Sequence, residues 1–418
     1  MKHFSHLNTA TQLIQQYTGE EPLHHFLRSF YAAHKRFGSK DRKRISHLCY
    51  LFYRVGRGFS YEVPLQRSED IHDVILAGLF LCEYQSDDLL AAIKPTWNER
   101  ISAGTAEKVL VINQELSPGH FRIEDIFPAT NELSPAIDKV ELSLSHLVQP
   151  DLFIRVRPGY TDVVHQKLTK ANVPYQVLSG SAVRLPNGLR IDDVIDLDRE
   201  AVVQDLSSQR VGEFLFDYLG DAGVHPGELA KVWDCCAASG GKSILAKDVL
   251  TNVDLTISDV RESILVNLKK RFQKAGIFNY NSFTADLSHT ASRRPAPKPA
   301  NRGDLILSRN SPFDLIVADL PCTGSGTWSR SPEQLYFFLH DKIEEYSQLQ
   351  KNILMNILPH LKETGKLLYI TCSVFRKENE AIIDFLVDTF RLKVERMELL
   401  KGYDKKADTM FAALLSRL

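Results

Sequence analysis

The first 112 residues of the chain carry apolar side chains at helical spacing. Apolar residues recur every three or four positions in groups such as Leu13, Ile14 and Tyr17, then Phe26, Phe30 and Ala33, then Ile45, Leu48, Phe52 and Val55. This period is typical of amphipathic helices, and no convincing alternating run indicates a strand. The sequence therefore predicts a helical bundle over about residues 3–112, followed by a connector with short helices to about residue 150.

The pattern changes after residue 150. Strands are expected at 152–156, 175–178 and 182–185, with a helix at 161–171, which together predict a small α/β module ending near residue 200. From about residue 202 strands and helices alternate, and this alternation is typical of a mainly parallel sheet. The expected strands are 231–233, 255–258, 282–284, 315–318, 367–370, 393–399 and 410–415, and the expected helices are 242–250, 262–275, 343–361 and 378–390.

These patterns predict an α/β fold in three domains. A helical domain with its connector covers residues 1–145, a small α/β subdomain covers 146–200, and a doubly wound, Rossmann-like domain covers 201–418. Residues 288–312, rich in Pro, Arg and Lys, interrupt the last domain and are expected to form a surface insertion.

Net charge adds little to this picture. The formal charge is −1, so any surface that binds nucleic acid must be local. One candidate is the basic stretch over residues 35–57, which interleaves aromatic residues with Lys35, Arg36, Lys40, Arg42, Lys43, Arg44, Arg54 and Arg57. The stretch is either a solvated helix face or a surface for RNA, and the sequence does not choose between them.

Cysteine usage and hydropathy limit the class of protein. None of the six cysteines forms a CxxC pair, and no His/Cys spacing is typical of zinc, so no metal is expected. The longest apolar run has nine residues, far short of a membrane span, and the N-terminal residues lack an apolar signal core. We therefore expect a cytoplasmic protein with no membrane partner.

The first segment that bears on chemistry is the glycine turn after the strand at 231–233. Residues 232–242 read Val-Trp-Asp-Cys-Cys-Ala-Ala-Ser-Gly-Gly-Lys, and the turn leads into a helix whose N-terminus would favour a carboxylate, such as that of a methionine moiety. The spacing is neither GxGxxG nor a Walker motif. Asp259, after the next strand, could accept hydrogen bonds from ribose hydroxyls, and Asp286 could meet an adenine amino group. Each aspartate could instead be a helix cap or turn residue.

Two later strands end in cysteines. The segment Asp319-Leu-Pro-Cys322 follows one buried strand, and Thr371-Cys-Ser373 follows another. Because parallel strands end at one edge of the sheet, both sulfurs are expected beside the cofactor. A thiolate that adds to carbon 6 of cytosine makes carbon 5 nucleophilic enough to take a methyl group. Spacing alone leaves Cys322 and Cys372 as rival nucleophiles, and Asp319 could contact the cytosine amine.

With these segments in order, residues from about 200 to 418 resemble the RNA 5-methylcytosine methyltransferase family, in its bacterial Sun-type ribosomal RNA branch. The resemblance rests on Val203-Gln-Asp-Leu-Ser-Ser-Gln209, Cys236-Ala-Ala-Ser-Gly-Gly-Lys242, Asp319-Leu-Pro-Cys322, Thr371-Cys-Ser373 and Glu378-Asn-Glu380. More loosely, the N-terminal bundle, with Ser39-Lys-Asp-Arg-Lys-Arg44, resembles the NusB-type RNA-binding domain of that branch, and the small module is similar to its RNA-facing subdomain.

The resemblance implies a set of roles. It implies S-adenosylmethionine as cofactor, RNA as partner, Cys372 as nucleophile and Cys322 as the group that assists product release, with Asp319 and Lys242 completing the catalytic set. The implied cofactor contacts are Cys236, Ala237, Ala238, Ser239, Gly240, Gly241, Lys242, Asp259, Asp286 and Asp319. This sequence departs from the family at Ser239, where a proline is usual and a looser loop is expected, and at Thr409, where a glycine is usual.

Two alternatives stay open from the sequence. One is a catalytically silent RNA-binding assembly factor that keeps the methyltransferase fold. The other is a methyltransferase that acts on a protein or an exocyclic nitrogen and needs no thiol. The intact Asp319, Cys322, Cys372 and Lys242 argue against the first.

Overall fold

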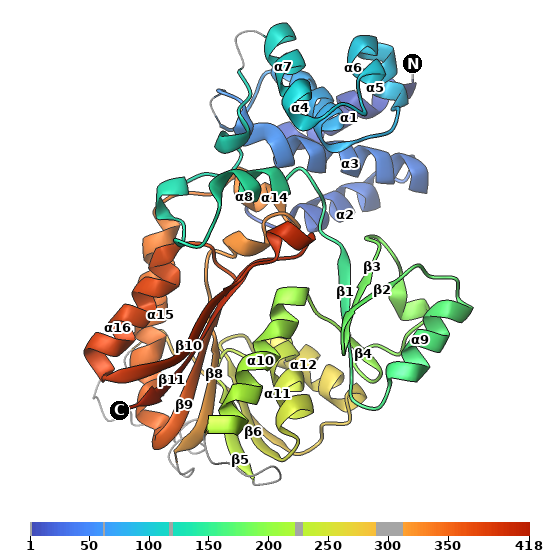
Figure 1. The fold of residues 1–418 in the computed structure, drawn as a ribbon. Helices are drawn as coiled ribbons and strands as arrows, with labels where there is room; N and C mark the ends of the chain where they lie inside the picture. The colour runs from blue at the N-terminus through green and yellow to red at the C-terminus, as the bar shows by residue number, and fades with distance from the viewer. Residues whose placement is uncertain (1, 62, 117–119, 222–228, 290–311) are drawn as a thin grey trace. The chain divides into compact units, whose positions relative to one another are not determined.

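The computed structural model of the chain describes residues 2–61, 63–116, 120–221, 229–289 and 312–418 (Figure 1). Two compact units account for the chain, one made of residues 1–133, 137–149 and 327–340, the other of residues 134–136, 150–326 and 341–418. Nearly all of the expected insertion at 288–312 lies outside the described residues.

The first unit is helical, as the apolar periodicity predicts. Its helices are α1 (Lys2–Gln16), α2 (Leu23–Ala33), α3 (Ser39–Val55), α4 (Ser68–Cys82), α5 (Asp88–Ile93), α6 (Pro95–Glu99), α7 (Thr105–Glu115), α8 (Lys139–Ser145) and α14 (Pro332–Tyr336). Helix α3 packs against α1, α4 and α14. The ring of Tyr336 on α14 lies 5.2 Å from Phe52 and 5.3 Å from Tyr53, both on α3. Residues 327–340 also belong to this unit, which the sequence pattern did not predict.

The basic stretch over 35–57 divides into two parts in this unit. Arg54 is only 5% exposed and donates hydrogen bonds to the carbonyl oxygens of His146 (2.5 Å) and Ser329 (3.1 Å). Arg57 likewise donates to the carbonyl oxygen of Phe338 (2.7 Å). Neither guanidinium is therefore free to form a surface for RNA, whereas the side chains nearer the start of the stretch are exposed, namely those of Lys35, Arg36, Lys40 and Lys43.

The second unit begins with a small antiparallel sheet. Its strands lie in the order β2-β3-β1-β4 and are β1 (Leu152–Val156), β2 (Gln176–Ser179), β3 (Ala182–Leu185) and β4 (Ala201–Val203). Helix α9 (Thr161–Lys170) packs Val164 and Leu168 against Ile154 and Val183 of the sheet. The strands expected at 152–156 and 182–185 are confirmed, and β4 was not predicted.

A seven-stranded sheet forms the rest of this unit, in the order β10-β11-β9-β8-β5-β6-β7. Its strands are β5 (Ala230–Asp234), β6 (Val253–Asp259), β7 (Tyr280–Thr284), β8 (Phe313–Asp319), β9 (Leu361–Thr371), β10 (Leu392–Leu400) and β11 (Met410–Arg417). The pairs among β5 to β9 are parallel, and β11 runs antiparallel to both β9 and β10. The predicted mainly parallel sheet is confirmed, and its chain order reverses at β5, where ligands bind in folds of this kind.

Helices cover both faces of the large sheet. Helices α10 (Leu206–Asp221), α11 (Gly241–Leu250) and α12 (Glu262–Lys274) lie on one face, and α15 (Lys342–Ile357) and α16 (Glu380–Phe390) lie on the other (Figure 1). Each face closes a separate apolar core. Helix α10 was not predicted, although Val211, Phe214, Leu215 and Tyr218 repeat at helical spacing and are buried.

Two boundaries differ from the sequence prediction. The helix expected to reach residue 361 ends at Ile357, because Pro359 follows within a short 3-10 turn and the chain enters β9 at Leu361. The helix expected from residue 378 begins at Glu380, and Glu378 lies in the 3-10 turn before it. Separately, none of the helices in the described ranges has both the length and the apolar character needed to cross a bilayer.

Candidate active site

The carboxyl ends of the parallel strands meet at a pocket of about 580 Å³. Most of the predicted site residues line this pocket, and they lie at the ends of strands that are distant in the sequence. These residues are Cys236, Ala238, Asp259, Asp286, Asp319, Cys322 and Cys372. The pocket volume lies within the roughly 300–1,000 Å³ typical of cofactor sites. The structure therefore brings both strand-end cysteines to one cavity with the predicted cofactor residues.

The turn after β5 contributes Cys236 and Ala238 to the lining of this pocket, and its glycines lie behind them. Gly240 has φ +84°, and a Cβ there would lie 2.8 Å from the Phe272 ring, so a side chain fits neither the backbone nor the space. Ala238 also has a positive φ, of 45°, and its N–H donates to Oδ2 of Asp259 (3.0 Å). Asp259 is not the N-cap of α12, since that position is Arg261. Its carboxylate instead joins the turn to the end of β6.

Several predicted cofactor residues do not line the pocket, namely Ala237, Ser239, Gly240, Gly241 and Lys242. The looser loop expected at Ser239 stays a prediction, and the structure shows hydrogen bonds that hold this residue. Arg271 donates through Nη1 to both the carbonyl oxygen (2.8 Å) and the hydroxyl (3.0 Å) of Ser239, and its Nη2 pairs with Asp198 (2.7 Å). These bonds hold the loop that a proline would otherwise stiffen.

Lys242 does not line the pocket itself, but it contacts Asp319, which does. Its Nζ lies 3.0 Å from Oδ2 of Asp319 and donates to the Ser208 hydroxyl at 2.8 Å. The ammonium is 10% exposed and the carboxylate is 29% exposed, so Asp319 keeps a face toward the cavity. The pair presents a cation and a carboxylate at fixed positions, which suits a polar ring that carries an amine and an oxygen.

The two cysteines are in direct contact. Their sulfur atoms lie 3.3 Å apart, although 50 residues separate them in the chain. The hydrogen bond with Cys372 and then burial raise the pKa of the Cys322 thiol well above its ordinary value, and the nearby Glu378 carboxylate adds to this. Cys322 is thus favoured as a neutral thiol.

Close backbone packing holds Cys372 in position. The Gly326 N–H donates to the carbonyl oxygen of Cys372 (2.9 Å), and the Thr409 N–H donates to the carbonyl oxygen of Gly326 (2.9 Å). A Cβ on Gly326 would collide with the Thr409 carbonyl oxygen at 1.9 Å, so only glycine allows this approach. Thr409 is the position where the family usually has glycine, and here its side chain is buried and accepts hydrogen bonds from the N–H groups of Gly402 and Tyr403.

The Glu378-Asn379-Glu380 segment braces both cysteine loops. The buried Glu378 carboxylate accepts hydrogen bonds from the Thr323 N–H (2.8 Å), the Thr323 hydroxyl (2.6 Å) and the Ser373 hydroxyl (2.5 Å). Asn379 donates to the Ser373 carbonyl oxygen (2.9 Å) and accepts from the Thr371 hydroxyl (2.6 Å). Cys372 is therefore held on both sides. The sequence marked this segment as a motif but assigned it no role.

Two further acids complete the description. Asp286 lines the pocket, and its carboxylate accepts hydrogen bonds from the Ser288 hydroxyl and N–H, which lower its pKa. Asp234 was not predicted, although an acid at a strand end before a glycine turn is a visible signal. It is buried, accepts a hydrogen bond from the Ser243 hydroxyl (2.5 Å), and burial raises its pKa to about 7.

Comparisons with known proteins agree with this geometry. Residues 223–413 match the family model described as 16S rRNA methyltransferase RsmB/F. The chain is 24% identical over 383 residues to ribosomal RNA small subunit methyltransferase B of Erwinia tasmaniensis, which covers 84% of this chain and 83% of that protein. The protein of the same name from Pectobacterium carotovorum is 23% identical over 420 residues, covering 91% and 92%.

Solved structures show the same fold. The crystal structure of PH0851 covers 99% of this chain and 98% of its own, with a TM-score of 0.66 at 17% identity. The structure of NSun6 from Pyrococcus horikoshii with SFG covers 67% of this chain and 95% of its own, with a TM-score of 0.53 at 13% identity. The fold described above is therefore shared with both of these solved structures.

Proposed function

We propose, from the premise that this chain belongs to the RsmB/F family of ribosomal RNA methyltransferases, that it methylates carbon 5 of a cytosine in ribosomal RNA. The methyl donor is S-adenosylmethionine. The observation that carries the cytosine assignment is the contact between Cys322 and Cys372, 3.3 Å apart in a pocket shared with Asp259 and Asp319. Methyl transfer to a nucleophilic nitrogen needs no thiol, so two apposed sulfurs favour a carbon target.

The pocket fits S-adenosylmethionine. Oδ1 of Asp259 accepts from both the N–H and the Nε–H of Arg261, whereas Oδ2 accepts only from the Ala238 N–H and keeps a lone pair for a ribose hydroxyl. Asp286 stands at the next strand end, near enough to the same cavity to meet the adenine. When bound, the cofactor supplies an electrophilic methyl group on a sulfonium.

The chain's own residues then carry out the reaction on cytosine. The Cys372 sulfur adds to carbon 6, and the electron pair of the 5,6 double bond moves to carbon 5, which takes the methyl group. A base next removes the carbon 5 proton, the double bond re-forms and the Cys372 sulfur leaves as thiolate. Cys322, in contact with that sulfur, is placed to assist the last step.

Asp319 and Lys242 are assigned to the cytosine ring. The Asp319 carboxylate accepts a hydrogen bond from the exocyclic amine, which uracil lacks, and Lys242 stabilises the charge that develops on the ring after sulfur addition. The target base must leave its stack to reach these groups.

The assignment of the two sulfurs is tested by substitution and trapping. Cys372→Ala is expected to abolish methyl transfer from labelled S-adenosylmethionine and covalent trapping by RNA that contains 5-azacytosine. Cys322→Ala is expected to accumulate a covalent protein–RNA adduct instead. Cys82→Ala, in the helical unit, is the matched control and is expected to behave as the unchanged protein. An adduct in Cys372→Ala but not in Cys322→Ala would reverse the two roles.

Two other functions are separated by the same assays. A silent assembly factor would incorporate no methyl group into unmodified ribosomal RNA, and the assembled Lys242–Asp319 and Cys322–Cys372 pairs argue against it. A nitrogen or protein methyltransferase would keep full activity in Cys372→Ala. Ribosomal RNA as substrate would place the enzyme in the cytoplasm.

The remaining domain assignments are also part of the proposal. We retain the division into residues 1–145, 146–200 and 201–418, with the first two in contact with RNA. In the helical unit, the exposed Lys35, Arg36, Lys40 and Lys43 form the basic surface that would meet phosphate groups.

A further inference from the structure

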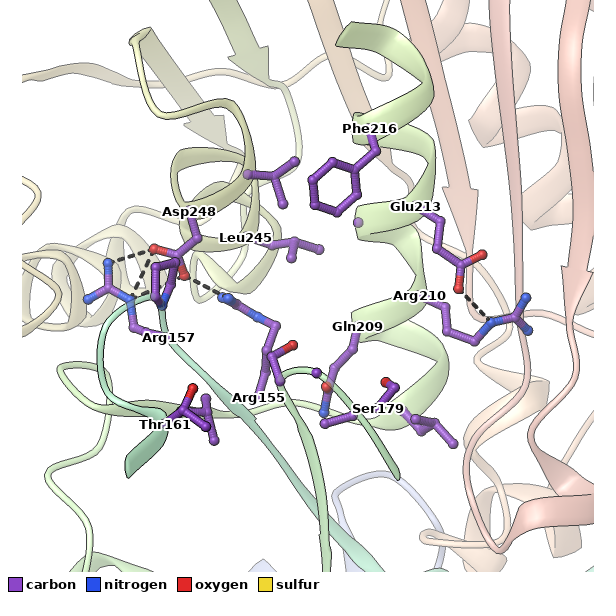
Figure 2. A pocket seen from close by; sticks show the side chains of 18 residues that line it. Arg155, Arg157, Thr161, Ser179, Gln209, Arg210, Glu213, Phe216, Leu245 and Asp248 are labelled. Atoms are coloured by element: carbon purple, nitrogen blue, oxygen red, sulfur yellow. Dashed lines mark hydrogen bonds and ion pairs between the residues drawn. The ribbon is translucent and has the colours of Figure 1, made fainter. Parts of the chain in front are cut away.

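A second pocket in the same unit contains none of the residues assigned above to catalysis or cofactor binding. It has a volume of about 490 Å³ and lies between the small antiparallel sheet and helices α10 and α11. Arg155 of β1 and the turn between β2 and β3 form one side of it, and Gln209 and Phe216 of α10 line the other (Figure 2). A cavity of this size is large enough for a nucleotide-sized ligand.

Two residues that line this pocket each carry a buried polar atom without a partner. Arg155 is 4% exposed and Gln209 is 8% exposed, and both line the cavity. Within the described part of the chain, neither Nη2 of Arg155 nor Oε1 of Gln209 forms a hydrogen bond. An unmet buried donor or acceptor costs about 1–3 kcal/mol, so the pair indicates a ligand that offers one acceptor and one donor.

Neighbouring bonds fix what each of these atoms can do. Arg155 donates through Nη1 to Asp248 (2.6 Å) and through Nε to Oε1 of Gln204 (2.8 Å), so its Nη2 is the remaining donor. Gln209 donates through Nε2 to the carbonyl oxygen of Gln204 (2.8 Å), which leaves its Oε1 as an acceptor. A phosphate would meet repulsion from that oxygen, whereas the edge of a nucleobase carries a donor beside an acceptor.

The rest of the pocket suits a flat, partly apolar ring. Phe216 is 61% exposed on α10 and lines the pocket, and Leu245 lies close to it in Figure 2. Arg157 lies at the rim, but its guanidinium is already used by Asp248 and by the carbonyl oxygens of Asp198 and Ala275. The pocket thus offers an aromatic face and a polar pair rather than a free cation.

We propose that this pocket receives an unpaired base of the substrate RNA other than the base that is methylated. The ring stacks on Phe216, an acceptor on its edge receives the Nη2–H of Arg155, and a donor on its edge bonds to Oε1 of Gln209. Every nucleobase presents such an edge, so the pair selects an extruded base rather than one particular base. The inference rests on the proposed function, because that function makes RNA the ligand.

A hydrogen-bond chain joins this pocket to the methylation site. Nε2 of Gln204 donates to the Ser208 hydroxyl (3.1 Å), which also accepts from Lys242 (2.8 Å), the partner of Asp319. Arg155 holds the other end of Gln204. All of these groups are therefore positioned by one network, and a base in the second pocket orders the residues that support Lys242.

The experiment compares two exposed phenylalanines in the full chain. Phe216→Ala removes the stacking face, and Phe278→Ala, 72% exposed and outside the pocket, is the matched control. Stacking of a base on an aromatic ring predicts a KM for unmodified ribosomal RNA that is raised roughly fivefold to a hundredfold in Phe216→Ala. The KM for S-adenosylmethionine and the Tm are expected to stay unchanged in both variants.

A second variant and a direct contact measurement complete the test. Gln209→Met removes the unmet acceptor and is expected to raise the RNA KM in the same way. Photo-crosslinking of ribosomal RNA that contains 5-iodouridine is expected to label the peptide that contains Phe216. An unchanged RNA KM in Phe216→Ala, or crosslinks that avoid α10, would overturn the proposal. The proposal would also be overturned if a free mononucleotide raised the Tm in a way that depends on Phe216 while RNA binding did not depend on Phe216.

The outcomes separate this proposal from the proposed function. If the unchanged protein methylates cytosine and Phe216→Ala has a normal RNA KM, the second pocket is not an RNA subsite and the proposed function stands. If the protein crosslinks RNA at α10 but transfers no methyl group to it, the subsite stands and the proposed function fails.

Discussion

Glu378 offers the sharpest test of how the two cysteines are held together. Its buried carboxylate accepts hydrogen bonds from Thr323, which follows Cys322, and from Ser373, which follows Cys372. Glu378→Ala would remove four hydrogen bonds to a charged acceptor, the fourth donated by Nε2 of Gln350, and leave buried donors unmet. The carboxylate's own burial, which raises its pKa, offsets part of this loss. The net cost to the free energy of unfolding is expected to be about 3–5 kcal/mol.

The consequence for catalysis follows from the same contacts. Without the carboxylate the two loops can separate, so the 3.3 Å contact between the sulfurs is lost and release of the methylated product slows. We expect kcat to fall at least roughly tenfold, equivalent to about 1.4 kcal/mol, with little change in the KM for S-adenosylmethionine. A covalent protein–RNA adduct is expected to accumulate although both cysteines are present.

Glu378→Gln is the matched control for geometry. The Thr323 and Ser373 hydroxyls can rotate to accept hydrogen bonds from the amide nitrogen, so the loss of stability is expected to be only about 1 kcal/mol. Because the Glu378 charge raises the pKa of the Cys322 thiol, its removal is expected to shift the pH profile of product release toward lower pH. The assays are thermal unfolding, single-turnover methylation and gel separation of the adduct. A Glu378→Ala protein with a lowered Tm but normal kcat and no adduct would refute the reasoning.

Three other predictions follow from single contacts. Lys242→Met leaves Asp319 without its cation and is expected to lower kcat about a hundredfold in labelled methyl transfer, with the Tm little changed. An unchanged kcat would exclude the role assigned to Lys242. Asp234 has a folded pKa of about 7, above its unfolded value, so the unfolded state binds fewer protons between about pH 4 and pH 7 and stability falls as pH rises through that window. Asp234→Asn should therefore flatten the difference in Tm between pH 5 and pH 8, and a steeper difference would contradict the pKa assignment. In the helical unit, Arg54→Met removes hydrogen bonds to the carbonyl oxygens of His146, Val148 and Ser329 and should cost about 3 kcal/mol by denaturant unfolding. The substitution of an exposed residue, Lys43→Ala, should stay within about 0.5 kcal/mol.

Much of the fold could be predicted from the local pattern of apolar and polar residues. The strand at 152–156 was predicted to the residue, and β5, β6, β8 and β9 all contain the strands expected there. These segments are readable because burial on both faces of a sheet demands near-continuous apolar runs, and a turn that needs positive φ demands glycine, as at Gly240. Helix α10 was not predicted, although its buried Val211, Phe214, Leu215 and Tyr218 repeat at helical spacing.

The sequence by itself determined that acids and cysteines lie at the carboxyl ends of predicted strands. Because parallel strands place their carboxyl ends at one edge of the sheet, these side chains were expected to meet there whatever the rest of the chain does. Only the tertiary structure decided that Cys322 touches Cys372 and that Glu378 bonds across 55 residues to Thr323. It also decided that Arg54 is buried rather than offered to RNA. The physical reason is that periodicity records which face of an element is buried, whereas a hydrogen-bond partner far along the chain depends on how the elements pack.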